Sequence, residues 1–126
     1  MAFILESNIG AVTAGMRRNL RKAVENTLFY GQAQMRTSMA EAKHGRTYGN
    51  HTASAPGESP AVDTSFLTNS IQVVMESDSE GVIGTNAEYA PHLEYGTVRM
   101  SPRPFFAPAF DEMKPIFEAE LKKAVS

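Results

Sequence analysis

The sequence contains no cysteine in its 126 residues. This absence excludes disulfides, thiolate zinc sites, iron–sulfur clusters and cysteine nucleophiles. No apolar run approaches the ~20 residues that a membrane-spanning helix needs, and residues 1–5 are too few for the apolar region of a secretion signal. We therefore expect a soluble chain with no membrane segment and no targeting signal.

Composition and length predict one folded domain over residues 1–126. Hydrophobic residues make up 42% of the chain, which is enough to build a core and argues against disorder. A chain of this size buries roughly two-thirds of the surface that its unfolded form exposes, and it leaves no room for a second independent core.

Charge is unevenly distributed although the net charge is only −2. Residues 1–46 carry seven basic and three acidic residues, a local charge of +4, and residues 47–126 carry five basic and eleven acidic residues, a local charge of −6. The sequence therefore predicts a molecule with a basic end and an acidic end.

The spacing of apolar residues predicts an α+β fold. Apolar residues recur at helical steps from residue 9 to residue 39 and again from residue 105 to residue 124, so we expect a long helix over about residues 8–42 and a C-terminal amphipathic helix. Pro115 predicts a kink in the second helix, or a start near residues 111–114. The β-rich runs 71–77 and 81–85 predict a hairpin. Both helices are expected to pack on this small antiparallel sheet.

Shorter elements connect these parts. Residues 43–63 are rich in Gly, Ser, Pro and Ala, which predicts a long central loop. One short helical turn is expected at residues 64–69, with Leu67 turned inward. Another is expected between Pro91, which suits a helix start, and Gly96, which suits a helix end.

The usual patterns of catalytic or cofactor sites are missing from the sequence. His44, His51 and His92 have no spacing typical of metal ligands, and no glycine-rich phosphate loop or nucleophile elbow occurs. Carboxylate neighbours such as Glu88 and Glu94 have nothing to position them over a substrate. We therefore predict no enzyme activity, no cofactor and no metal.

Two features are typical of binding surfaces. The run Arg17–Lys22 has four cations on one helix and predicts either a solvated face or a contact with phosphates, so a small nucleic-acid-binding protein stays an alternative. The segment from Gly84 to Phe110 concentrates aromatic, proline and arginine residues, the types enriched in protein interfaces. We predict a partner interface from these two features: Arg17, Arg18, Arg21, Tyr89, Glu94, Tyr95, Met100 and Arg103.

The segment IGTNAEYAPHLEYGTVRMSPRPFFAPAF resembles the signature of a tail-component family of tailed phages, typified by gene product ten of the Hong Kong lambdoid coliphages. Its members have Gly-Thr-Asn, Tyr-Ala-Pro, Glu-Tyr/Phe-Gly-Thr and Arg-Pro-Phe before a closing helix. The upstream segment ASAPGESPAVDTSFLTNSI is similar to a second motif of that family. Together with the hairpin, the two motifs cover about residues 53–110.

The resemblance implies a structural protein of the virion, located at the head–tail joint or the upper end of the tail and assembled in the host cytoplasm. It implies a homo-oligomer, arranged as a six-fold ring, that contacts neighbouring neck and tail proteins. Contact with nucleic acid is expected to be non-specific at most, and no contact with membranes is expected.

Overall fold

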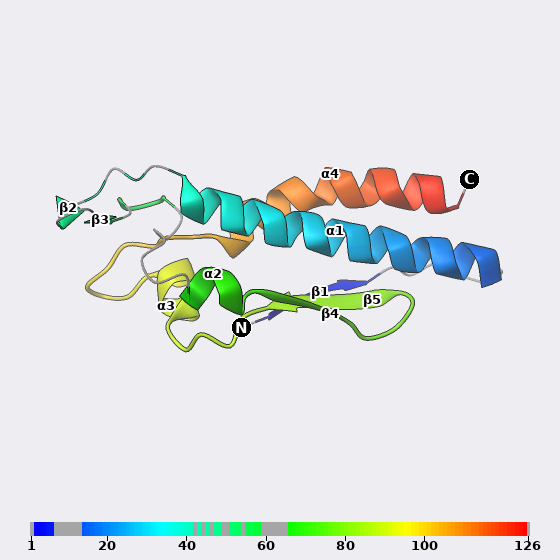
Figure 1. Ribbon diagram of the computed structural model, residues 1–126, viewed down its shortest axis with the longest axis horizontal. Coiled ribbons are helices and arrows are strands. Elements are labelled where there is room, and N and C mark those ends of the chain that lie inside the picture. The colour runs from blue at the N-terminus through cyan, green and yellow to red at the C-terminus, as the bar shows by residue number, and fades with distance from the viewer. Residues whose placement is uncertain are drawn as a thin grey trace.

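The computed structural model describes residues 2–6, 14–41, 43, 45, 47–48, 51–53, 55–58 and 66–125. The protein has an α+β fold, as the apolar pattern predicts, with a long N-terminal helix, a C-terminal helix and a small antiparallel sheet. The molecule is elongated, and the long helix runs along most of its length (Figure 1).

The long helix α1 (Ala14–Ala40) presents one apolar stripe to the core. Every large side chain of this stripe is at most 4% exposed: Leu20, Val24, Leu28, Met35 and Met39. These residues repeat at steps of four and seven, which places them on one helix face. The predicted start of the helix near residue 8, with Ser7 or Asn8 as its cap, lies outside the described residues.

The sheet has the strand order β1-β5-β4, with both pairs antiparallel. Strands β4 (Gln72–Met75) and β5 (Glu80–Gly84) form the predicted hairpin. Strand β1 (Ala2–Glu6) was not predicted, because five residues at the start of the chain carry little periodic signal by themselves. Its partner β5 lies far away in the sequence, so pairing across the fold makes this segment a strand.

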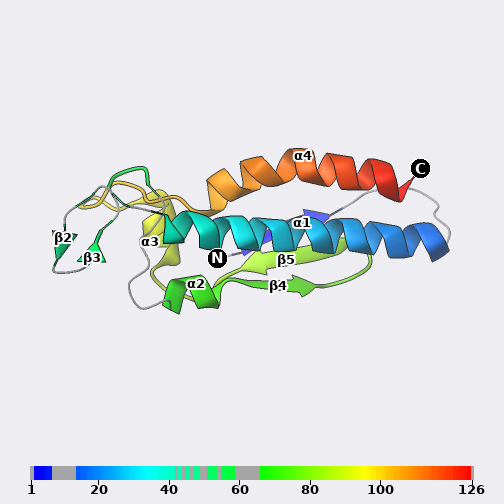
Figure 2. The same cartoon turned by 45° about the horizontal axis from the view of Figure 1, so that its top comes forward.

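The layers follow the order sheet, α1 and then α4 (Phe106–Ala124). One face of the sheet lies against α1, and α4 lies on the opposite side of α1, running antiparallel to it (Figures 1 and 2). The C-terminal helix therefore packs chiefly on α1 and not directly on the sheet as predicted. Gly31 of α1 allows this approach, because a Cβ there would overlap the Met113 side chain.

Helix α4 begins at Phe106 and continues through Pro115. The predicted start near residues 111–114 is therefore wrong. Pro115 is exposed, so the carbonyl group that it leaves without an intrahelical partner lies near the solvent. Burial of Phe106, Ala109 and Met113 against the core holds the first turns together.

Two short helices match the sequence expectation. Helix α2 (Phe66–Ser70) turns Leu67 into the core at 8% exposure. Helix α3 (Ala90–Tyr95) has Pro91 in its first turn and ends at Gly96. The predicted turn residues before Phe66 lie outside the described residues.

The central loop contains a short antiparallel ladder that was not predicted. Strand β2 (Thr47–Tyr48) pairs with β3 (His51–Thr52), and the Gly45 N–H donates to the Ala53 carbonyl at 2.9 Å. Two-residue strands have no periodicity that a sequence pattern can reveal. Residues 59–63 of the predicted loop lie outside the described residues.

Candidate interaction surface

The segment that carries the phage-tail resemblance links β5 to α4. It passes through α3 and the following turn at the end of the molecule that lies on the left in Figure 1. Its end is anchored by Phe105 and Phe106, which are 1% and 0% exposed and whose ring centroids lie 4.9 Å apart. Two fully buried aromatic rings fix where this segment meets the core.

Glu94 holds the start of α4 from within α3. Its Oε1 accepts hydrogen bonds from the backbone N–H groups of Phe105 at 2.9 Å and Phe106 at 2.8 Å, and its Oε2 accepts one from Ala107 at 3.1 Å. The first N–H groups of a helix have no intrahelical acceptor, and a carboxylate there also interacts favourably with the helix dipole. Glu94 therefore caps α4 from eleven residues away.

Glu94 is 5% exposed, so it does not belong to the exposed surface on which it was predicted. The residue before α4 is Phe105, whose side chain makes no capping hydrogen bond. A helix that starts without Ser, Thr, Asp or Asn needs a cap from elsewhere. The missing cap is the sequence signal that an acceptor must come from another segment, and the structure identifies that acceptor as Glu94.

A tight turn follows α3. The N–H of Thr97 donates to the Met100 carbonyl at 2.8 Å, and the N–H of Met100 donates to the Thr97 carbonyl at 3.3 Å. The N–H of Arg99 donates to Thr97 Oγ1 at 3.2 Å. Gly96 enters the turn at φ 77°, and a Cβ there would contact the Met100 carbonyl. Val98 and Arg99 lie at the apex, and Val98 is fully exposed.

The chain after the turn is tied to two other segments. The N–H of Arg103 donates to the Leu93 carbonyl, and the N–H of Gly57 donates to the Pro102 carbonyl at 2.9 Å. The Arg103 guanidinium also donates to the Ser101 carbonyl at 2.6 Å. Arg103 and Met100, both predicted contact residues, are half-buried, so part of each side chain braces the loop.

Exposed aromatic side chains flank the turn. Tyr95 is 68% exposed, and Tyr89 is 43% exposed beside Phe66, with 6.3 Å between ring centroids. Tyr89 and Tyr95 thus have the exposure that a contact role requires, while the contact itself stays a prediction. Phe66, at 57%, was missed because it lies outside the dense segment, and Val98 was missed because valine is not a residue type enriched in interfaces.

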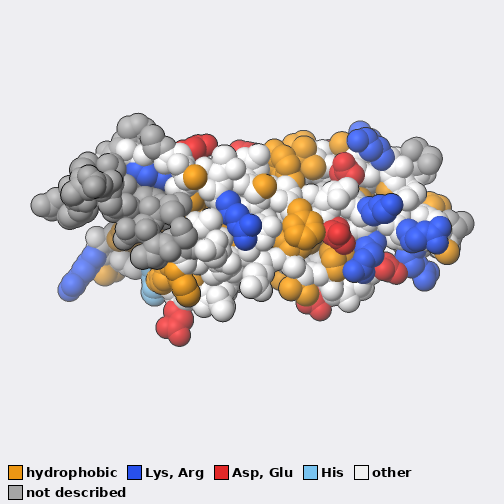
Figure 3. All heavy atoms as spheres, viewed as in Figure 1, with side chains coloured by type: hydrophobic (Ala, Val, Ile, Leu, Met, Phe, Trp, Pro, Cys, Tyr) orange, Lys and Arg blue, Asp and Glu red, His pale blue; other side chains and the backbone are white. Residues whose placement is uncertain are grey.

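The predicted cations of α1 lie at the other end of the molecule. Because α4 runs antiparallel to α1, its last turn packs beside Leu20 and Ala23 and brings Lys122 and Lys123 to the same end. Figure 3 shows Lys and Arg side chains gathered there. The basic end therefore includes two lysines that are remote from Arg17 and Arg18 in the sequence.

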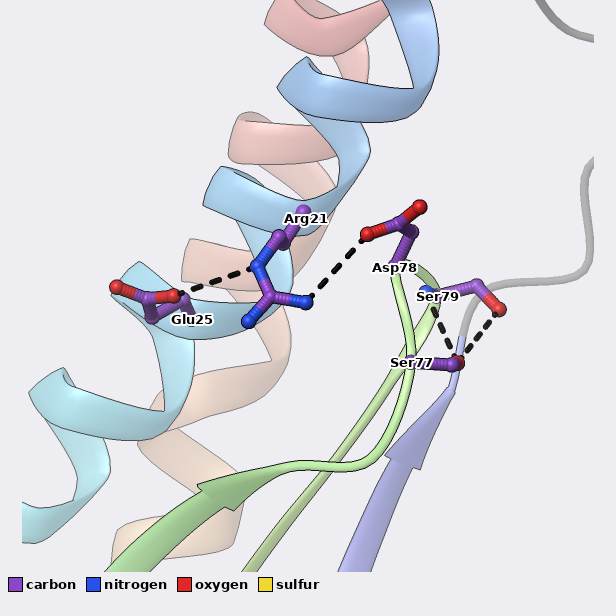
Figure 4. Close-up of polar contacts among 5 residues, drawn as sticks. All are labelled: Arg21, Glu25, Ser77, Asp78 and Ser79. Carbon is purple, nitrogen blue, oxygen red and sulfur yellow. Dashed lines mark hydrogen bonds and ion pairs between the residues drawn. The ribbon is translucent and has the colours of Figure 1, made fainter. Parts of the chain in front are cut away.

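Arg21 is already engaged within the chain. Its guanidinium lies 4.0 Å from the Glu25 carboxylate and 3.4 Å from that of Asp78, in the turn between β4 and β5 (Figure 4). The turn is further braced by Ser77 and Ser79. In the described part of the chain no acidic side chain pairs with Arg17 or Arg18, so two of the three predicted cations are left for other contacts.

Comparison with protein-family models, with curated proteins and with solved structures gives no match for this chain. Within the described ranges, no group of three His, Asp or Glu side chains is arranged to hold a metal ion. Over the same residues, no helix combines the length and the apolar character that crossing a membrane requires.

Proposed function

We propose that this protein is a structural subunit of the virion of a long-tailed phage or prophage, assembled into a ring at the head–tail joint or the top of the tail. The observation that carries the proposal is that Glu94 is buried whereas its neighbour Tyr95 is exposed. The buried carboxylate locks the segment to α4, and the neighbouring ring points to the solvent at 68% exposure.

This arrangement suits a surface built for protein contact. Association costs free energy when loops and side chains must be ordered, so a segment that is already fixed binds at lower cost. Tyrosine offers a large and stiff contact area with few rotatable bonds. Glu94, the turn bonds and the Arg103–Leu93 bond fix this segment before any partner arrives.

The two ends of the molecule differ in chemistry, which favours a head-to-tail arrangement. One end carries the exposed side chains of Tyr89, Tyr95 and Val98. The other end gathers cations from both long helices (Figure 3). A contact between two different surfaces of identical subunits generates a ring when the rotation closes. Exposed ion pairs contribute only ~0.2–1 kcal/mol each, so apolar contacts supply most of the affinity and charge sets orientation.

Deletion of the gene from its prophage, followed by induction and electron microscopy, tests this function. We expect heads and tails that fail to join, or tails whose ends are abnormal. The wild-type chain supplied in trans should restore complete particles. The Tyr95→Ala chain should fail to rescue, whereas Glu88→Gln, a change at an exposed residue of the same segment, should succeed. Complete particles without the gene would contradict the proposal.

A nucleic-acid-binding role is the second candidate, favoured by the gathering of Arg17, Arg18, Lys22, Lys122 and Lys123 at one end. Phosphate contacts make the binding constant fall steeply with salt. Filter binding of a DNA duplex across a salt series distinguishes the two roles. A steep slope that is lost in the Arg17→Ala/Arg18→Ala variant would favour the second candidate, and weak binding by both chains would favour the first.

A further inference from the structure

The face of the sheet that α1 does not cover carries a row of apolar side chains. Ile4 lies opposite Val82, and Val82 lies opposite Val74, so the three line up across the strands. Ile4 and Val74 are 59% and 51% exposed, and Val82 is half-buried between them. An apolar row on an exposed sheet face is unusual unless something covers it.

A shallow hollow of about 320 Å³ lies over this face, between the row and the end of α2. Ala2, Val74 and Val82 form the apolar part of its wall, and four neutral polar side chains, Ser70, Gln72, Thr85 and Asn86, form the rest with Gly84. Its volume falls at the small end of the roughly 300–1,000 Å³ range of ligand pockets, and none of the residues that line it is charged. The hollow can therefore take one apolar side chain against Val74 and Val82, with neutral polar groups beside it.

Negative charge adjoins the hollow. Glu76 precedes the hairpin turn and lies two residues, about 7 Å, beyond Val74. Glu80 follows the turn and lies two residues, about 7 Å, before Val82. Among the described residues no cation pairs with either of them. Asp78, between them in the sequence, is bound to Arg21.

The turn at the far end of the molecule has the complementary chemistry. Val98 is fully exposed at its apex, and Arg99 follows it with an exposed side chain. Residues 95–110 contain two arginines and no acidic residue. The turn follows α3 at the left end of Figure 1, and none of its residues lines the hollow over the sheet, so the turn that fills the hollow belongs to another copy.

We infer that the Val98 turn of one copy inserts into the sheet hollow of the next copy, with Arg99 directed to Glu76 and Glu80. The occupant is a second copy of this chain because the turn supplies both the apolar side chain and the charge that the hollow and its rim lack. Two different surfaces meet in this contact, so it propagates from copy to copy and forms the proposed ring when the rotation between copies closes. The inference rests on the proposed ring and names the contact that builds it.

Two variants, each defective on one side of the contact, test this inference by native mass spectrometry. Val98→Glu removes the inserting side chain, and Val74→Glu places a charge in the hollow; both positions are exposed, so folding is retained. Each variant alone should be monomeric, with a Kd raised about tenfold or more. A mixture of the two should form one-to-one dimers and nothing larger, because one intact turn and one intact hollow remain. Ala33→Asp, an exposed site on α1, is the matched charge control and should assemble normally.

A charge exchange gives a second readout that does not depend on the folding of the Val74 variant. Arg99→Glu and Glu76→Arg should each weaken assembly, and combining them in one chain should restore it. Normal assembly of Val98→Glu, or failure of the exchange to restore assembly, would overturn the inference and leave the ring proposal standing. A wild-type chain that stays monomeric at every concentration would contradict both.

Discussion

The Glu94 carboxylate accepts a hydrogen bond of 2.8 Å from the backbone N–H of Phe106, the first residue of α4. A second bond of 2.9 Å, from the N–H of Phe105 to the same carboxylate, joins two parts of the motif that resembles the phage-tail family, Glu-Tyr-Gly and Arg-Pro-Phe. It gives the glutamate an internal role and leaves the adjacent Tyr95 to face the solvent. Stability and contact are therefore assigned to neighbouring residues, and substitutions should separate them.

Replacing Glu94 should destabilise the monomer. Glu94→Gln keeps the side-chain shape but replaces one acceptor oxygen by an NH₂ group, which cannot accept the hydrogen bond from the Ala107 N–H. We therefore expect a loss of about 1–3 kcal/mol in the free energy of unfolding. Glu94→Ala should cost more, because three N–H groups lose their acceptor. Urea unfolding followed by circular dichroism measures both.

Glu88→Gln is the control for this series, since Glu88 is exposed on the same segment. Its unfolding free energy should match the wild type within about 0.5 kcal/mol. Equal stability of Glu94→Gln and Glu88→Gln would contradict the capping role.

Gly31 and Met113 should be energetically coupled. Alanine is favoured over glycine in a helix by about 0.5–1 kcal/mol, but a Cβ at position 31 would overlap the Met113 side chain. Gly31→Ala should therefore destabilise the wild type and stabilise the Met113→Ala background, which has room for the added methyl group. A double-mutant cycle should give a coupling of at least about 1 kcal/mol. Additive effects would show that α1 and α4 do not meet at this point.

The sequence predicts the elements whose signals are local. The apolar stripe of α1, the hairpin of β4 and β5, and the Pro91-to-Gly96 bounds of α3 all arise from spacing within one segment. Strand β1 and the stacking of α4 on α1 depend on contacts between segments that are remote in the sequence. No repeating pattern of apolar residues within one segment identifies the remote segment that it contacts.

The same division holds for the surface. Dense aromatic composition indicated Tyr89 and Tyr95, and both are exposed. Composition also predicted Glu94 as an interface residue. The sequence alone does not distinguish a carboxylate that caps a helix from one on the surface until the first residue of the helix is known. Lys122 and Lys123 join the basic end only through the antiparallel packing of the two long helices.

Phe106 should be the more sensitive of two phenylalanines in helices. Phe106→Ala empties a fully buried site, so we expect a loss of about 3–5 kcal/mol, a large part of the stability of a small domain. Phe29→Ala, at a position that is 48% exposed on α1, should cost much less. Melting temperatures compare the two, and similar losses would contradict the packing described for the start of α4.

The Arg21–Asp78 pair should make a small and salt-dependent contribution to stability. Both side chains are about half exposed, at 45% and 49%, so Asp78→Asn should cost about 0.2–1 kcal/mol at low salt. At about 1 M salt the Debye length falls to ~3 Å, and the difference should vanish. Urea unfolding at the two salt concentrations measures this. A cost that persists at high salt would indicate a role other than charge pairing.

Arg18 should affect assembly and not folding, because in the described structure it has no acidic partner. Arg18→Glu should lower the assembled fraction at low salt and leave the melting temperature unchanged, with a smaller effect as salt is raised. Sedimentation velocity across a salt series follows the assembled fraction. An assembled fraction equal to that of the wild type at every salt concentration would remove the basic end from the contact.

Native mass spectrometry of the wild-type chain over a concentration series tests the central claim most directly. The account predicts a single closed oligomer above a threshold concentration, absent from the Tyr95→Ala variant although that variant melts at the wild-type temperature. A wild-type chain that remains monomeric throughout, or a Tyr95→Ala chain that forms the same oligomer, would contradict it.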